Sequence, residues 1–259
     1  MNQILTFIHS GAKIASNVII EPFVTIEKNV VILEGSYIGP NVTILEGARI
    51  GRNCKIFPGS VISAIPQDLK FQGEDTTTII GDNTTIRECV TINRGTASKG
   101  QTIIGSDCLI MAYCHVAHDC TVGNHVIISN ATQLAGEVNI GDWTIIGGGS
   151  LIHQFTHIGA HVMIQGGSKI NKDIPPFVKA AREPISYCGI NSVGLRRRGY
   201  TNNQIRDIQE IYRFLYHSGM NNSTAIKHIE AELPAIRERD EVILFVRNSP
   251  RGIMKGYFD

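Results

Sequence analysis

Residues 8–62, written in groups of six, read IHSGAK IASNVI IEPFVT IEKNVV ILEGSY IGPNVT ILEGAR IGRNCK IFPGSV I. Every group begins with isoleucine, and the register resumes at Ile80 and continues to Ile170. Of the 28 positions in this class, 25 are aliphatic. Because the exceptions, Asp68, Glu74 and Ser98, fall in two polar stretches, we expect residues 63–78 and 93–101 to leave the repeat as loops.

A period of six matches neither an amphipathic α-helix, which repeats every 3.6 residues, nor a flat strand, which alternates every two. It fits a prism in which each hexad is a short strand and a corner. The aliphatic side chain points inward, and so does a small residue four positions later. We expect corners that need unusual backbone angles where glycine directly follows the inward aliphatic. These glycines are Gly39, Gly51, Gly81, Gly105, Gly123, Gly141, Gly147 and Gly159.

Three hexads make one triangular coil, so residues 18 apart become vertical neighbours. About nine coils, with strands ~4.8 Å apart, would form a rod about 45 Å long. We assign the rod to residues 1–175, because the repeat ends at Asp173-Ile174-Pro175-Pro176. Residues 176–259 are predicted to form a helical domain that covers the open end of the rod. One helix follows a capping box at Thr201 and stops at Gly219, and two more are expected near 223–233 and 238–246.

The composition and charge indicate where the protein is located and which partners it can attract. Its 259 residues are 42% hydrophobic and carry a net charge of +1, which predicts a folded core and no overall attraction to nucleic acid. Because no signal peptide and no membrane-spanning run is recognisable, a cytoplasmic location is expected.

Four of the six cysteines fall at the small inward position of the repeat, which predicts reduced core residues rather than disulfides or a zinc site. These are Cys54, Cys108, Cys114 and Cys120.

The segment His115-Val116-Ala117-His118-Asp119 carries the strongest catalytic signal. Because Val116 points inward, the neighbouring side chains lie on one face and its corner. A histidine can accept a proton near neutral pH, and an adjacent carboxylate can orient its ring. A hydrogen-bonded surface pair without a catalytic role is the alternative interpretation.

Stacking places further groups in line with His118. Gly136 falls one coil above it, and Gln154, beside His153, falls two coils or roughly 10 Å above. This arrangement suits acyl transfer, in which His118 deprotonates a hydroxyl, the alkoxide attacks a thioester and the Gly136 N–H holds the oxyanion. No serine or cysteine stands in this line, which favours direct transfer over an acyl-enzyme. We also expect the reaction to use no metal or cofactor.

The two predicted loops offer polar groups to the same region. The first contains Gln67, Asp68 and Lys70, which could grip a polar ligand, although a solvated loop is the alternative. The second carries Arg94 and Lys99 and is expected to close over a phosphate or an acidic carrier.

Five motifs together resemble the UDP-N-acetylglucosamine 3-O-acyltransferase family of lipid A biosynthesis, and the resemblance covers nearly the whole chain. It implies a left-handed parallel β-helix and a homotrimer with active sites between subunits. It also implies transfer of an (R)-3-hydroxyacyl group from acyl carrier protein to the 3-hydroxyl of UDP-N-acetylglucosamine. The motifs are Gln67-Asp68-Leu69-Lys70, Arg87-Glu88-x-Val90-Thr91-Ile92-x-Arg94-Gly95-Thr96, His115-x-Ala117-His118-Asp119, His153-Gln154-Phe155 and Gly194-Leu195-Arg196-Arg197-Arg198-Gly199.

The resemblance also implies roles for single residues. His118 would be the general base, Asp119 its orienting partner and Gly136 the oxyanion donor. Residues expected to bind the sugar, the acyl chain or the nucleotide, or to line the cleft, are Gln67, Asp68, Lys70, His115, His153, Gln154, Asn191, Arg197 and Arg198. Gly166 matches the position that limits acyl length in the family and leaves room for a long chain.

Three positions depart from the family pattern. Glu137, also placed among the substrate-binding residues, replaces a common histidine; Val193 replaces a glutamate, and Asn93 replaces another histidine. These changes leave open whether the acceptor is a 3-hydroxyl or a 3-amino group, and an acyl-CoA donor is a further alternative.

A zinc hydro-lyase of the carbonic anhydrase type is the rival from another class, because such enzymes use the same β-helix. His153, His157 and His161 have a suggestive spacing, but the hexad register predicts that they lie on different faces. A purely structural β-helix would need neither the His-Asp pair nor the arginine run.

Overall fold

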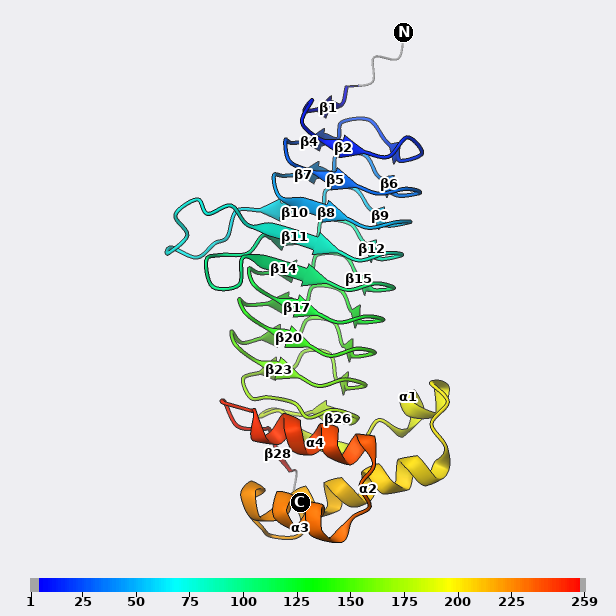
Figure 1. Ribbon diagram of the computed structural model, residues 1–259, viewed down its shortest axis with the longest axis vertical. Helices are drawn as coiled ribbons and strands as arrows, with labels where there is room; N and C mark the ends of the chain where they lie inside the picture. Colours follow the sequence, from blue (N-terminus) through cyan, green and yellow to red (C-terminus); the bar gives the residue numbers. More distant parts are fainter. Residues whose placement is uncertain (1–4, 257–259) are drawn as a thin grey trace.

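The computed structural model describes residues 5–256 and shows a three-sided rod of parallel strands followed by helices (Figure 1). The first sheet contains β1 (Phe7–Ile8), β4 (Thr25–Ile26), β7 (Thr43–Ile44), β10 (Val61–Ala64), β13 (Thr91–Asn93), β16 (His115–Val116), β19 (Gln133–Leu134), β22 (Leu151–Ile152) and β25 (Lys169–Ile170). The second sheet contains β2 (Lys13–Ile14), β5 (Val31–Ile32), β8 (Ala48–Ile50), β11 (Thr77–Ile80), β14 (Gln101–Ile104), β17 (Thr121–Val122), β20 (Asn139–Ile140) and β23 (His157–Ile158). The third sheet contains β3 (Ile19–Ile20), β6 (Tyr37–Ile38), β9 (Lys55–Ile56), β12 (Thr85–Ile86), β15 (Leu109–Ile110), β18 (Ile127–Ile128), β21 (Ile145–Ile146), β24 (Met163–Ile164), β26 (Val178–Ala181), β27 (Ser186–Ile190) and β28 (Lys255–Gly256).

The strand register confirms the stacked coils. Val122 pairs with Ile140, 18 residues later, as do most other neighbours along the rod. Two places lengthen the period. Ile50 pairs with Ile80, and Ile80 with Ile104, so the chain adds 12 and then 6 residues to the repeat. These additions form the loops 65–76 and 94–100, which project from the same side of the rod (Figure 1).

The inward aliphatic residues form one continuous core along the rod. From Ile26 to Ile170 every one of them in a strand is buried, whereas Ile8 at the open N-terminal end is 45% exposed. The small residues four positions later, such as Cys54 and Val126, are buried between them.

The corner glycines act differently from the expectation. Positive φ angles occur three residues after the inward aliphatic, for example at Asn53 (+53°) and Asp119 (+60°), and not at the glycines that directly follow it. The glycines that directly follow the inward aliphatic are needed because the backbone of the next coil occupies the space that a Cβ would fill. A Cβ on Gly105 would lie 2.5 Å from the Gly123 carbonyl oxygen.

The chain after residue 173 closes the C-terminal end of the rod. β26 extends the third sheet, β27 pairs with it antiparallel, and β28 adds on parallel to β27. The helices are α1 (Ser192–Arg197), α2 (Asn202–His217), α3 (Asn222–Glu232) and α4 (Arg237–Arg247). The predicted capping box at Thr201 is present. The strands β26 to β28 and helix α1 were not predicted, and because β26 continues the third sheet, a domain boundary near residue 175 stays a prediction.

Tyrosine side chains anchor the helices to the rod. The buried Tyr212 hydroxyl donates to the Pro176 carbonyl, and the Tyr216 hydroxyl donates to the Met254 carbonyl over 3.0 Å. Among residues 5–256, no helix is long and apolar enough to cross a bilayer.

Candidate active site

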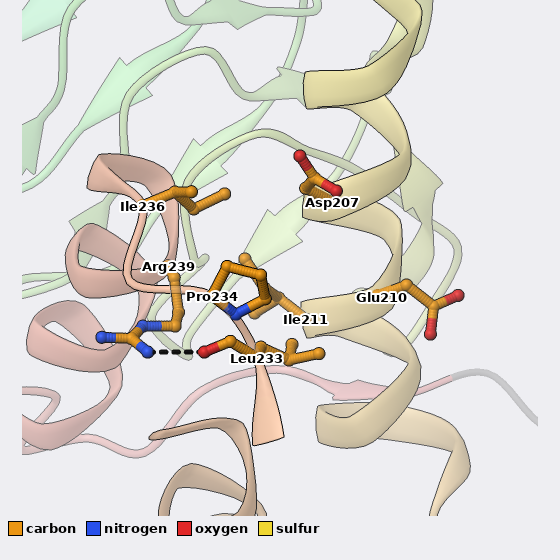
Figure 2. Close-up of a pocket in the computed structure, with 7 residues that line it drawn as sticks. All are labelled: Asp207, Glu210, Ile211, Leu233, Pro234, Ile236 and Arg239. Atoms are coloured by element: carbon orange, nitrogen blue, oxygen red, sulfur yellow. Dashed lines mark hydrogen bonds between the residues drawn. The ribbon is translucent and has the colours of Figure 1, made fainter. Parts of the chain in front are cut away.

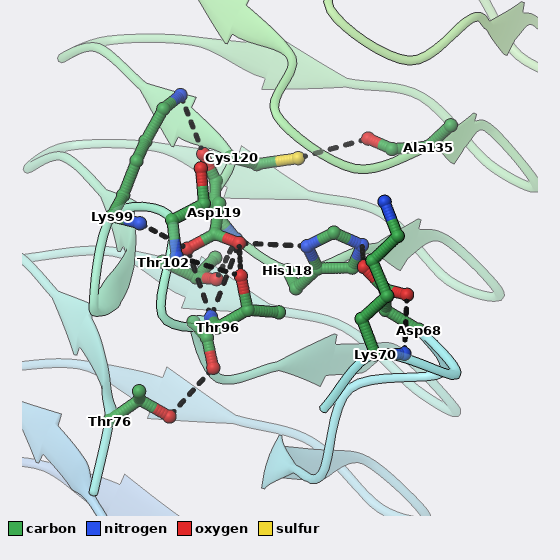
Figure 3. Close-up of polar contacts among 12 residues, drawn as sticks. Asp68, Lys70, Thr76, Thr96, Lys99, Thr102, His118, Asp119, Cys120 and Ala135 are labelled. Carbon is green, nitrogen blue, oxygen red and sulfur yellow. Dashed lines mark hydrogen bonds and ion pairs between the residues drawn. The ribbon is translucent and has the colours of Figure 1, made fainter. Parts of the chain in front are cut away.

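His118 and Asp119 form a hydrogen-bonded pair at the corner between the first and second sheets. His118 Nδ1 lies 2.8 Å from Asp119 Oδ2, and the Asp119 side chain is fully buried. An ionised carboxylate only accepts hydrogen bonds, so the imidazole Nδ1 carries the hydrogen. The other ring nitrogen, Nε2, is left as the proton acceptor. It faces Asp68 of the first loop, whose Oδ2 lies 4.0 Å away (Figure 3).

The second loop covers the Asp119 carboxylate. Asp119 Oδ1 accepts from the main-chain N–H groups of Thr96 and Lys99 at 3.0 and 3.2 Å. The Lys99 ammonium donates to the Asp119 carbonyl over 3.0 Å, and the Arg94 guanidinium lies over the Phe71 ring. Both cations thus contact the protein's own groups, and the expectation that this loop closes over a phosphate or an acidic carrier stays a prediction.

Gly136 lies against the imidazole ring, as the 18-residue stacking predicts. A Cβ at this position would lie 2.6 Å from both Cε1 and Nε2 of His118. The adjacent N–H groups are used between coils, since Ala135 donates to Ile152 and Glu137 donates to His118. For the Gly136 N–H itself, residues 5–256 supply no acceptor. Gly136 is buried and does not line the groove described next, and in this part of the chain its N–H is left without an acceptor beside His118.

A groove of about 560 Å³ lies along the first sheet in front of Nε2. It brings together five of the eleven predicted substrate residues, and its lining is Gln67, Asp68, Leu69, Lys70, His115, Ala117, His118, Leu134, Ala135 and Gln154. Asp68 is fixed within the loop, because its Oδ1 accepts the Lys70 main-chain N–H over 2.9 Å.

His115 enters this groove as a neutral imidazole. Its Nδ1 lies 2.7 Å from the Thr91 hydroxyl, which comes from the strand directly beneath. Burial, and secondarily the neighbouring His118, lower the pKa of His115 below its ordinary value of 6.5. His115 is thus suited to hydrogen bonding with a ligand rather than to carrying charge.

Other predicted residues lie outside the groove. His153 is exposed on the same corner, where its Nδ1 lies 3.0 Å from the Gln154 carbonyl oxygen. Glu137, half-buried, follows Gly136 at this corner with a φ of +60°. Gly166 is exposed at the corner between the third and first sheets.

The predicted nucleotide residues lie at the third corner, between the second and third sheets. Asn191 donates to the His161 carbonyl over 2.9 Å and also caps helix α1. The Arg198 guanidinium lies over the Trp143 ring at 5.4 Å and 3.3 Å from His161 Nδ1, and Arg197 is exposed. Burial, with a contribution from Arg198, lowers the pKa of His161 to about 4. One chain therefore does not bring Asn191 or Arg198 to His118.

The three histidines of the zinc alternative are distributed over separate parts of the rod. His153 follows β22 of the first sheet, His157 lies in β23 of the second, and His161 lies in the ring stack with Trp143 at the next corner. This arrangement offers no common centre for a metal ion.

A smaller pocket of about 230 Å³ lies in the helical part, away from this chemistry. Figure 2 shows α2 with Asp207 and Ile211 beside the segment between α3 and α4, whereas the Glu210 carboxylate points away from that segment. There the Arg239 guanidinium donates to the Leu233 carbonyl over 2.7 Å. This pocket holds no acid–base pair comparable to His118 and Asp119.

Sequence reasoning missed the threonines that support the site. Thr96 and Thr91 contact Asp119 and His115, and the Thr102 hydroxyl accepts the Asp119 N–H over 2.8 Å. Thr91 and Thr96 belong to the quoted motifs, but nothing in the hexad register assigns a side chain of the second loop to a partner.

The hexad prism with a His-Asp pair beside a groove matches the class of hexapeptide-repeat transferases. Family models agree. Residues 101–136 match bacterial transferase hexapeptide repeats, residues 173–254 match the second domain of Udp N-acetylglucosamine O-acyltransferase, and residues 3–103 match a GMPPB C-terminal domain.

Curated relatives specify the family. The acyl-(acyl-carrier-protein)--UDP-N-acetylglucosamine O-acyltransferase of Trichlorobacter lovleyi is 49% identical over 253 residues, which cover 96% of this chain and 97% of the relative. The enzyme of that name from Chlorobium phaeobacteroides is 50% identical over 195 residues, covering 75% and 74%. The chain therefore belongs to the acyl-(acyl-carrier-protein)--UDP-N-acetylglucosamine O-acyltransferase family.

Solved structures agree with this assignment and with a left-handed β-helix. LpxA of Bacteroides fragilis, described as a UDP-N-acetylglucosamine acyltransferase, superposes with a TM-score of 0.96 at 54% identity and covers 98% of this chain and 100% of its own. LpxA of Acinetobacter baumannii gives a TM-score of 0.95 at 40% identity, covering 98% and 99%.

Proposed function

We propose that this protein transfers an (R)-3-hydroxyacyl chain from acyl carrier protein to the 3-hydroxyl of UDP-N-acetylglucosamine, the first step of lipid A biosynthesis. Membership of the family supports the reaction class and both substrates. The single observation that carries the chemistry is the free Nε2 of His118 beside the groove and against Gly136.

Each step of the transfer has a group suited to it. His118 Nε2 takes the proton of the sugar hydroxyl, and the oxygen attacks the thioester carbonyl carbon. The Gly136 N–H stabilises the oxyanion that forms, and the collapse of this intermediate expels the carrier thiolate, which takes the proton back from His118. Asp119 holds the ring and stabilises its charged form while it carries the proton.

Direct transfer without an acyl-enzyme is supported by the protonated thiol of the nearby Cys120. Cys120 follows Asp119 in the chain, and its Sγ donates to the Ala135 carbonyl over 3.2 Å. Burial raises the pKa of this thiol to about 12, so it stays protonated and is a poor nucleophile. All six cysteines are unpaired, as expected for the proposed cytoplasmic location.

We assign substrate contacts by position. Gln67, Asp68, Lys70, His115 and Gln154 hold the sugar and the start of the acyl chain, because they line the groove. Around it, His153 and Glu137 flank the acceptor, and Gly166 borders the distal acyl chain. Asn191 and Arg198 grip the nucleotide of the site formed with a neighbouring subunit, and Arg197 belongs to the basic surface that meets substrate or carrier.

A homotrimer accounts for the separation of these groups. Residues on two different corners can join in one cleft when rods pack side by side about a threefold axis. An apolar column on the outer face of the third sheet supports such packing, since side chains of this kind favour burial between subunits. Its stacked residues are Leu109, Ile127, Ile145 and Met163.

The direct test is mass spectrometry of the product. UDP-N-acetylglucosamine is incubated with a ladder of 3-hydroxyacyl carrier proteins, with acyl-CoA and the 3-amino UDP-sugar as competing donor and acceptor. We expect an ester from the carrier-bound donor and a loss of turnover on the order of 10²- to 10⁴-fold in His118→Ala. Preference for acyl-CoA or amide formation would replace the proposal with the corresponding alternative, and near-normal turnover of His118→Ala would refute the general base.

A further inference from the structure

Thr96 contacts the Asp119 carboxylate with both its main-chain and its side-chain donor. The Thr96 N–H lies 3.0 Å from Oδ1, and the hydroxyl Oγ1 lies 2.6 Å from Oδ2, the same oxygen that binds His118 Nδ1 (Figure 3). Thr96 is only 8% exposed, so these hydrogen bonds are largely shielded from water.

The direction of the hydroxyl bond is fixed by a neighbour. The Ser98 main-chain N–H donates to Thr96 Oγ1 over 3.2 Å. Since the hydroxyl oxygen accepts from Ser98 and the carboxylate is acceptor-only, the hydroxyl hydrogen is directed to Asp119 Oδ2. Asp119 in turn accepts the hydrogen of His118 Nδ1, so the chain of hydrogen bonds has one consistent polarity.

The surrounding loops hold Thr96 in place. The Thr76 hydroxyl, at the end of the first loop, donates to the Gly95 carbonyl over 2.6 Å, and the Gly100 N–H donates to the Thr96 carbonyl over 2.7 Å. A Cβ on Gly95 would lie 2.2 Å from the Gln101 nitrogen, so the turn before Thr96 admits only glycine without rearrangement.

We propose that Thr96 is a positioning residue, which through Asp119 sets the tautomer and orientation of His118. The inference rests on the proposed acyl transfer. Without the hydroxyl, Asp119 Oδ2 loses its shortest hydrogen bond and the carboxylate can rotate away from Nδ1. His118 then spends part of its time with the hydrogen on Nε2, and in that tautomer it cannot accept the substrate proton.

The test compares Thr96→Val, which keeps the shape and removes the hydroxyl, with Thr96→Ser, which restores it. Thr78→Val is the matched control. Thr78 is fully buried and pairs with Thr102 across the second sheet, and within residues 5–256 its hydroxyl has no hydrogen-bond partner. We expect kcat to fall about 10- to 100-fold in Thr96→Val, the loss typical of one hydrogen bond to a charged group, with KM for UDP-N-acetylglucosamine nearly unchanged. Thr96→Ser should recover most of kcat, and Thr78→Val should keep it.

Nitrogen-15 NMR of histidine-labelled protein supplies a readout independent of activity. The His118 signals, assigned by their loss in His118→Ala, should show hydrogen on Nδ1 in the wild type and a mixture of tautomers in Thr96→Val. If Thr96→Val does not fold, judged by circular dichroism, Thr96→Ala takes its place. An unchanged tautomer, a change in KM alone, or failure of serine to restore kcat would overturn the inference. A wild type that makes no acylated UDP-sugar would instead refute the proposed function, while the tautomer comparison would still test Thr96.

Discussion

At the scale of single residues, the site depends on the absence of a Cβ atom at Gly136. The coils on either side place residues with a Cβ, His118 and Gln154, at the position of Gly136 on the same corner. The corner itself therefore does not require glycine. The His118 ring requires it, because it occupies the space that a Cβ would fill.

We expect Gly136→Ala to lose most activity while the rod stays folded. The new methyl would overlap Cε1 and Nε2 of His118 and push the ring out of line with the acceptor hydroxyl, and a displacement of about 1 Å can cost roughly 100-fold in rate. Steady-state kinetics measure the loss, and thermal unfolding checks the fold. Activity within a fewfold of the wild type would contradict the close packing of Gly136 on the ring.

The stacking rule explains which residues could be predicted. Because residues 18 apart are neighbours, the sequence alone placed Gly136 above His118, and the hydrogen bond from Glu137 N to the His118 carbonyl confirms it. This 18-residue spacing does not predict the neighbours of residues in a loop that leaves the repeat. The contact of Thr96 with Asp119, and the capture of Lys99 by the Asp119 carbonyl, therefore could not be predicted.

At the scale of elements, the first loop is an insertion into an otherwise continuous prism. Its 12 residues equal two hexads, so the coils before and after it keep their register. Leu69 at its tip is fully exposed, and the loop contributes Gln67, Asp68 and Lys70 to the groove.

Deletion of residues 65–76 should leave a folded rod without activity. Ala64 would then be joined to Thr77, and Ile80 would follow Ile62 at the distance of one hexad. We expect circular dichroism close to that of the wild type and no detectable transfer, because Asp68 and its neighbours are gone. A chain that fails to fold would show that the loop stabilises the prism rather than serving only the site.

The junction between the rod and the C-terminal segment contains a buried carboxyl. Asp173 is fully buried; its Oδ1 accepts the His157 N–H over 2.8 Å, and its Oδ2 has no partner among residues 5–256. Its main chain bonds to Gly252 and Met254. Burial raises the pKa of Asp173 above its ordinary value of 3.8. The hydrogen bond from the His157 N–H and the positive charges of His157 and Arg251 favour the ionised carboxylate, as does the Ser249 side chain, but their effect is smaller than that of burial.

This raised pKa predicts a pH-dependent stability. Between pH 3.8 and the higher folded-state pKa, the native protein holds a proton that the unfolded chain has lost, so the free energy of unfolding falls as pH rises through that window. Asp173→Asn removes this dependence. We expect the Tm of the variant relative to the wild type to rise from pH 3.5 to pH 7, at one fixed protein concentration. A difference that is constant with pH, or that falls from pH 3.5 to pH 7, would exclude this interpretation.

At the scale of the whole molecule, one chain carries the proposed catalytic pair and the proposed nucleotide residues on different corners. His118 lies between the first and second sheets, whereas Arg198 packs on Trp143 between the second and third. Helix α1, which Arg198 directly follows, lies near the C-terminal end of the rod (Figure 1). If neighbouring rods complete each other's clefts, every site needs one corner from each of two chains.

Mixed oligomers test this sharing directly. His118→Ala and Arg198→Ala are each expected to be nearly inactive as pure proteins, the second through loss of nucleotide binding. In trimers refolded from an equal mixture, about a quarter of the sites would combine an intact His118 from one chain with an intact Arg198 from its neighbour, and activity should recover to about that fraction. Light scattering verifies the trimer. A site contained within a single chain would always hold one of the two defects, so a mixture as inactive as its components would show that the corners do not cooperate across subunits.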